Sequence, residues 1–75
     1  MSSDLTLYVV YCRPRDFPEE WVVRRHFVKG GICWVDRELF ARGDTLAAVR
    51  RALPVGLSCI GREPGDDGAI FECWV

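Results

Sequence analysis

The sequence lacks the patterns that mark most catalytic and metal-binding sites. Its 75 residues contain one histidine, His26, and the four cysteines include neither a C-x-x-C pair nor a cysteine–histidine pair at zinc-finger spacing. No G-x-S-x-G motif accompanies His26, and the seven glycines form no phosphate-binding loop. The acidic run at Glu63, Asp66 and Asp67 is too short for a calcium loop, and we interpret it as a solvated turn. We therefore predict that the protein is not an enzyme and has no catalytic residue, metal or cofactor.

Long apolar segments and an excess of charge are missing as well. The longest apolar run, L-T-L-Y-V-V-Y-C at residues 5–12, is far shorter than a membrane span. The residues before it contain Asp4 and no basic cluster, which is unlike a secretory signal. The net charge of −1 creates no general attraction to nucleic acid or to anionic membranes. We expect a cytoplasmic protein without a membrane partner. Its cysteines should be reduced and buried as small hydrophobic side chains, at Cys12, Cys33, Cys59 and Cys73.

The composition is that of one small folded domain. Hydrophobic residues make up 49% of the chain and charged residues 28%, as in ordinary globular proteins. The whole chain, residues 1–75, is therefore predicted to form a single domain. A domain of this length has little room for a deep pocket, so a surface, a groove or a subunit interface is the expected place for any binding site.

Alternating and β-branched residues predict five strands separated by turn formers. The pair Gly30-Gly31 should link the second and third strands by a tight turn. Residues 36–42 are charged and mixed, and their pattern predicts no element. The predicted strands cover residues 5–12, 21–28, 32–35, 57–60 and 69–75.

One helix is predicted between the third and fourth strands. Asp44 is a suitable N-cap for a helix of about nine residues that begins at Thr45. Leu46, Val49 and Leu53 recur at helical spacing, and the following proline ends the helix. The fold class is therefore α+β, a two-layer domain with an antiparallel four- or five-stranded sheet, one short helix and the order β-β-β-α-β-β.

The predicted helix is too small to cover this sheet. The first two strands carry large apolar side chains on both faces, whereas an antiparallel sheet with one face in water usually alternates apolar with polar residues. Two explanations remain open. Either self-association or a partner covers the excess apolar surface, or the loops between strands fold back over it.

Three functional hypotheses follow. The first is a protein-interaction surface centred on Trp21, Arg24, Trp34 and Trp74, because tryptophan and arginine are enriched at binding hot spots. The second is a single-stranded nucleic-acid site, in which arginines flank Trp21 but nearby acidic residues would neutralise them. The third is a homodimer of unknown role. The arginines of the second hypothesis are Arg13, Arg15, Arg24 and Arg25.

Three segments carry a resemblance to known sequences: Y-V-V-Y-C-R-P-R-D-F-P-E-E-W-V-V-R-R at residues 8–25, the segment T-L-A-A-V-R-R-A-L-P-V-G-L and the final E-P-G-D-D-G-A-I-F-E-C-W-V. They resemble small proteins of bacterial genomes and prophages that have no established activity. The resemblance implies a phage or prophage origin. By analogy with anti-CRISPR proteins, it suggests a protein that binds a bacterial host complex.

Overall fold

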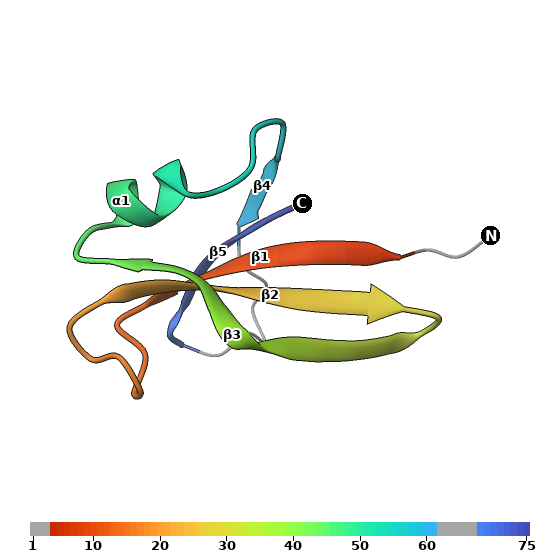
Figure 1. The fold of residues 1–75 in the computed structure, drawn as a ribbon, viewed down its shortest axis with the longest axis horizontal. Helices are drawn as coiled ribbons and strands as arrows, with labels where there is room; N and C mark the ends of the chain where they lie inside the picture. The colour runs from red at the N-terminus through yellow and green to blue at the C-terminus, as the bar shows by residue number, and fades with distance from the viewer. Residues whose placement is uncertain (1–3, 62–67) are drawn as a thin grey trace.

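A computed structural model describes residues 4–61 and 68–75, which form a five-stranded antiparallel sheet and one short helix (Figure 1). The strands lie in the order β3-β2-β1-β5-β4. The predicted antiparallel sheet, with a helix between the third and fourth strands, is confirmed. The acidic run predicted as a turn lies outside the described residues. The elements are β1 (Leu5–Cys12), β2 (Trp21–Lys29), β3 (Ile32–Gly43), α1 (Leu46–Arg51), β4 (Cys59–Gly61) and β5 (Ile70–Trp74).

The third strand is much longer than predicted. It extends through residues 36–42, where the sequence pattern indicates no element, and it pairs with β2 along its length. The pairing is irregular: Arg24 lies opposite Leu39, whereas His26 lies opposite Val35. Two extra residues of β3 are accommodated between these points, as in a β-bulge, which disrupts the alternation that a strand prediction needs.

The helix is shorter than predicted: it begins one residue later and ends earlier, at Arg51. Thr45, rather than Asp44, is the N-cap, because its extended backbone lets Oγ1 accept a hydrogen bond from the Ala48 amide at 3.1 Å. Gly43 allows the close approach of helix and sheet, since a Cβ there would lie 3.0 Å from the Cβ of Ala48.

The core lies between this helix and the sheet. Val10 of β1, Val23 of β2 and Val49 of α1 form its centre, and each is at most 1% exposed. The predicted apolar side of the helix is confirmed, because Leu46 and Leu53 also pack against this cluster. Aromatic side chains complete the cluster at its margin, namely Tyr8, Trp21, Phe40 and Trp74.

The opposite face of the sheet is covered by the connection between β1 and β2, residues 13–20. Asp16 binds Arg24 at 2.6 Å, and the ring of Phe17 lies 5.8 Å from the guanidinium carbon of Arg42. Both arginines lie on the face away from the helix. Beneath them, Val9 and Val22 are 2% and 0% exposed. In this half of the molecule, the loop folds back over the sheet.

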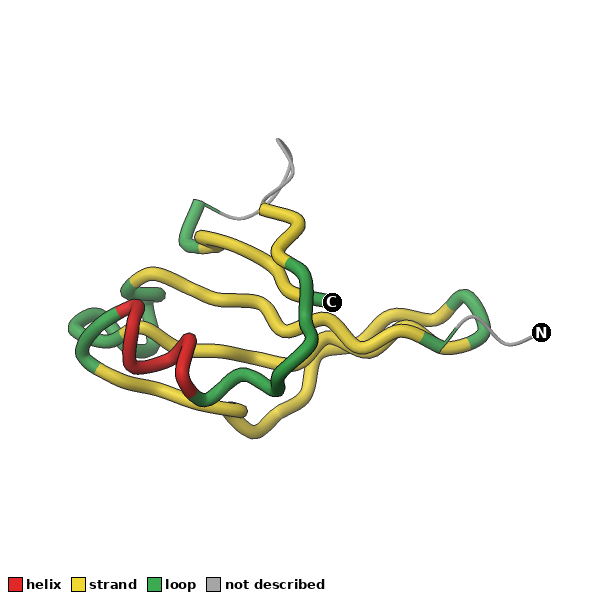
Figure 2. Tube along the Cα trace, turned by 90° about the horizontal axis from the view of Figure 1, so that it is seen from above, coloured by secondary structure: helices red, strands yellow, loops and turns green. Residues whose placement is uncertain are grey.

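The other half of the sheet projects beyond the helix. The chain measures 40 Å along its longest axis against 26 and 24 Å along the others. Figures 1 and 2 show the cause: the β2–β3 hairpin and the start of β1 run together away from the helix as a narrow extension. We call this extension the arm and define it as residues 5–7 of β1, 26–29 of β2, the turn at Gly30–Gly31 and residues 32–35 of β3.

Candidate interaction surface

The arm concentrates exposed apolar side chains. Ile32 is 66% exposed, and Leu5, Trp34 and Val35 are each 45% exposed. Lys29 is the only lysine or arginine of the arm, and the arm contains no carboxylate. A solvated strand normally carries polar residues on at least one face. The arm therefore exposes more apolar surface than a solvated strand pair usually does.

The arm is bare because the elements that cover the body do not reach it. The helix packs on β2 and β3 around Val23 and Ala41, and β5 begins to pair with β1 only at Tyr8. The described part of the chain thus places three strands in the arm and no element over them. Each arm face consequently meets solvent.

Trp34 is the largest exposed side chain of the arm. Its ring packs against that of Phe27 on the neighbouring strand, with centroids 5.7 Å apart and planes tilted by 40°. A shallow hollow of about 210 Å³ lies beside these rings and is lined also by Leu5 and Val28. The neighbouring ring holds Trp34 in place, so binding through it would require little loss of side-chain freedom.

The outer edge of β3 offers unpaired backbone groups along the arm. Gly30 and Gly31 have φ values of +57° and +83°, the positive values that a two-residue hairpin turn requires. In such a hairpin, Lys29 and Ile32 flank the turn and exchange backbone hydrogen bonds. Pairs farther along the ladder alternate between bonded and non-bonded, and the pairs that contain Cys33 and Val35 are the non-bonded ones. The N–H and C=O groups of Cys33 and Val35 therefore point away from β2 toward solvent.

The four residues predicted as a protein interface do not lie together. Trp21 and Trp74 pack at the margin of the core, where the Trp21 ring meets Phe71 edge-on at 5.1 Å. Arg24 lies on the opposite face of the sheet in its ion pair with Asp16. Trp34 alone among the four belongs to the arm.

The four arginines predicted as a nucleic-acid site are also divided. Arg24 and Arg25 are adjacent in β2 and so point to opposite faces. Arg25 binds Asp36 at 2.7 Å, and its guanidinium carbon lies 5.6 Å from the ring centres of both Phe27 and Phe40. Arg15 and Arg24 line one open hollow of about 450 Å³ next to Tyr11. Arg13 is exposed in the loop, with a φ of +47°.

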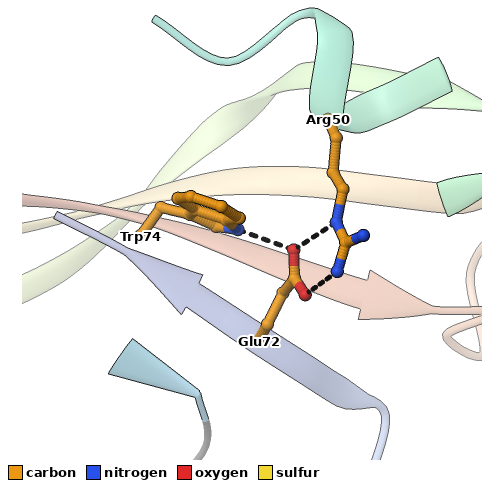
Figure 3. A network of polar contacts seen from close by, with 3 residues as sticks. All are labelled: Arg50, Glu72 and Trp74. Atoms are coloured by element: carbon orange, nitrogen blue, oxygen red, sulfur yellow. Dashed lines mark hydrogen bonds and ion pairs between the residues drawn. The ribbon is translucent and has the colours of Figure 1, made fainter. Parts of the chain in front are cut away.

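A buried carboxylate links the helix to the last strand (Figure 3). Glu72 is 4% exposed, and its two oxygens accept hydrogen bonds from Arg50 at 3.0 and 2.5 Å. The indole N–H of Trp74 donates a third bond at 2.6 Å. The bonds from Arg50 lower the pKa of Glu72, with a smaller contribution from Trp74, although burial opposes this. The same contact raises the pKa of Arg50.

A second carboxylate lies where the arm joins the body. Asp36 accepts a hydrogen bond from the backbone N–H of Glu38 at 3.1 Å and one from Arg25 at 2.7 Å. Chiefly the Glu38 amide, and then Arg25, lower the pKa of Asp36. Both perturbed carboxylates are thus bound by groups of the chain itself and serve its structure.

The remaining candidates for chemistry are dispersed. His26 meets the hydroxyl of Tyr11 at 3.0 Å. None of the four cysteines, all of which are described, forms a disulfide, but the prediction that they are buried is wrong: Cys33 and Cys59 are exposed and the other two are partly covered. In residues 4–61 and 68–75, no cluster of histidine, cysteine or carboxylate side chains could hold a metal ion. No helix within the same residues has the length and apolar character to cross a membrane.

The buried Glu72 and the exposed arm differ in how far the sequence alone could have predicted them. The sequence pattern puts Glu72 on the same strand face as Ile70 and Trp74, and nothing in that pattern distinguishes a buried carboxylate from a solvated one. The arm, in contrast, leaves a signal: Ile32–Val35 is a run of four residues without charge that follows a glycine turn. What the run cannot show is that β1 and β2 extend beside it with no cover.

Comparison with known proteins adds no assignment to this geometry. No protein-family model matches the sequence, and searches of curated proteins and of solved structures find no match.

Proposed function

We propose that the protein is a non-enzymatic protein-interaction module that binds through its arm. In this proposal, the helix and the sheet are stacked as two layers and act as a scaffold, while Trp34 is the central contact residue. The single observation that carries the proposal is the exposure of Ile32, Trp34 and Val35 on a strand that no described element covers. Such a surface costs solubility, and binding is a reason to retain it.

The partner class in this proposal is a bacterial protein complex. The resemblance to prophage-type proteins suggests a phage or prophage origin and a cytoplasmic site of action, by analogy with proteins that block host defence. Trp21, Arg24 and Trp74 then contribute only indirectly, by holding the scaffold, since their side chains are engaged within the body.

The test compares two changes of a surface apolar residue to serine. Trp34→Ser alters the arm, and Val55→Ser alters a valine that is 99% exposed outside the arm. Each tagged variant is used to capture proteins from a bacterial lysate, with mass spectrometry as the readout. We expect Val55→Ser to retain the partners of the wild type and Trp34→Ser to lose them. Equal capture by the two variants would contradict a role for the arm.

Single-stranded nucleic-acid binding stays an alternative, and one observation favours it. Arg15 and Arg24 share a hollow with Tyr11, which offers an aromatic ring beside two cations. The ion pair of Arg24 with Asp16 weighs against it. Binding to a short oligonucleotide should fall steeply with salt and should weaken in Arg15→Gln. Absent or salt-insensitive binding would eliminate this alternative.

A further inference from the structure

Among the described residues, no strand pairs with the outer edge of β3 in the arm, which is regular and lacks the features that usually block strand pairing. Natural edge strands carry prolines, charges or bulges that prevent another chain from adding to the sheet. Residues 32–35 carry none of these, and their pairing with β2 is regular. Protection begins only at Asp36, where charged residues and the β3 irregularity start.

The exposed backbone groups of this edge are arranged symmetrically. Cys33 and Val35 each direct an N–H and a C=O outward, and Trp34 lies midway between them. A twofold axis through Trp34 would place Cys33 of one copy opposite Val35 of a second copy, and the reverse. Each of these two pairs would then exchange two backbone hydrogen bonds, as a hydrogen-bonded pair of antiparallel strands does. The edge is therefore complementary to itself.

From this symmetry, we propose that two copies of the chain pair edge to edge through residues 32–35 of β3, with Trp34 opposite Trp34 of the second copy. The result is one continuous antiparallel sheet across both copies. This inference rests on the part of the proposed function that makes the arm a contact surface, and it names a second copy of the chain, in place of a bacterial complex, as the protein that the arm binds.

The side chains fit this register. Residues opposite each other in a pair without backbone hydrogen bonds have the closest side chains, so the two Trp34 rings would meet. Phe27 already packs on Trp34, and four aromatic rings would line the new seam. Ile32 would lie opposite Asp36 of the second copy, with Lys29 beside it on the same face.

Other symmetric registers fit less well. An axis through Val35 would place three edge residues opposite charges at the irregular part of β3, compared with Ile32 alone in the register centred on Trp34. The three pairs would be Ile32 with Glu38, Cys33 with Arg37 and Trp34 with Asp36. An axis through Cys33 would place Val35 opposite the turn residue Gly31 and leave its outward groups with a poor partner. Only the register centred on Trp34 pairs the outward backbone groups of Cys33 with those of Val35.

The pairing is expected to be weak, because an interface of one short strand and a few side chains is at the low end of specific interfaces. Sedimentation over a range of concentrations should show a monomer of 8.6 kDa in equilibrium with a dimer of twice that mass, with a micromolar dissociation constant. Trp34→Ala should raise this constant roughly a hundredfold, since both copies lose a central ring. Val55→Ser serves as the matched control and should leave it unchanged.

A proline variant separates edge pairing from folding. Val35→Pro removes an amide that points to solvent, so the β2–β3 ladder keeps its hydrogen bonds and the fold should persist. We expect circular dichroism like that of the wild type together with a monomer at every concentration. A folded Val35→Pro protein that still dimerises would overturn the proposal.

Cross-linking tests the register. In a Cys59→Ser background, which removes the other exposed thiol, Val35→Cys would place Cys33 of one copy opposite the new thiol of the other. Residues of a hydrogen-bonded pair have Cα atoms about 5.5 Å apart, which a disulfide can span. Mild oxidation should then give a covalent dimer, and Cys33→Ser should abolish it. Cys33 alone should not cross-link, because two Cys33 residues would be diagonal neighbours about 7–8 Å apart.

The outcomes distinguish this inference from the proposed function. A dimer that cross-links through Cys33 and position 35 supports the inference. A dimer without that cross-link, open-ended aggregates, or a monomer at all concentrations would overturn it. If the monomeric protein still captures a bacterial partner that Trp34→Ser loses, the inference fails while the proposed function stands. If neither the dimer nor the capture of a bacterial partner depends on Trp34, both the inference and the proposed function fail.

Discussion

The two halves of β3 show how differently one strand can be used in the same sheet. In the body, Phe40 and Ala41 pack against the valine core beneath the helix. In the arm, Ile32 and Trp34 are equally apolar and yet remain exposed. The difference is the cover above them, and it teaches that hydrophobic sequence predicts burial only where the topology supplies a second layer.

Charge follows the same division. All four described ion pairs join residues of the body, and three of them lie away from the arm, including the buried contact of Glu72 with Arg50. The fourth joins Arg25 to Asp36 where the arm begins. Beyond that point the arm has Lys29 as its only lysine or arginine. The body thus holds the described ion pairs, although the buried Nε of Arg25 has no hydrogen-bond partner there, whereas the arm presents apolar side chains and an open backbone edge.

The largest expected contrast in stability comes from a valine-to-alanine substitution made once in the body and once in the arm. Val10→Ala removes two methyl groups from the fully buried core and should lower the free energy of unfolding by about 2–3 kcal/mol. Val35→Ala, at a half-exposed arm position, should change it by less than about 0.5 kcal/mol. Urea unfolding measures both. Similar losses at the two positions would remove the distinction between body and arm.

A smaller effect is expected from the buried carboxylate. Folding lowers the pKa of Glu72 below its ordinary value of 4.5, so its stabilisation is fully present above that pH and is lost as the pH falls through the folded value. Glu72→Gln should therefore be less stable than the wild type near neutral pH, and the difference should shrink in acid. The measurement is the free energy of unfolding at a series of pH values.

Asp36 is the control for this pH dependence, because its pKa is also lowered. Asp36→Asn should remove its own share of the acid sensitivity and leave that of Glu72 in place. If Glu72→Gln kept the full acid sensitivity of the wild type, the contact with Arg50 would not be the cause.

The smallest effect should stay within the arm. Gly31→Ala places a side chain at a φ of +83° and should destabilise the turn by roughly 1 kcal/mol. Amide exchange should then quicken at Lys29 and Ile32 and stay unchanged at Val10 and Val23. Gly30→Asn, at a φ of +57° that asparagine tolerates, is the matched control. Faster exchange in the core would show that the arm and the body unfold together.

Local pattern was sufficient to predict much of this fold. The range of β1 matches its prediction, and the apolar spacing of Leu46, Val49 and Leu53 identifies the helix face that packs on the core. These features depend on neighbours a few residues apart. The long second half of β3 could not be predicted, because its pairing depends on Arg24 and His26 of another strand and on an irregular register.

The surface was harder to predict than the fold. Three tryptophans look equivalent in the sequence, but Trp21 and Trp74 are engaged by Phe71 and Glu72, whereas Trp34 is exposed. Only three-dimensional packing separates them. Of the two explanations for the excess apolar surface, the loop at residues 13–20 accounts for the body, whereas the apolar side chains of the arm stay exposed in the described structure.

The stability of a doubly substituted arm tests the central claim most directly. Ile32→Ser combined with Trp34→Ser removes the two largest exposed apolar side chains at the β3 edge. At low protein concentration, where self-association contributes little, urea unfolding of this variant should give a free energy within about 1 kcal/mol of the wild type. A loss as large as that expected for Val10→Ala would show that these side chains belong to the folded core, and would contradict the view of the arm as a surface for binding.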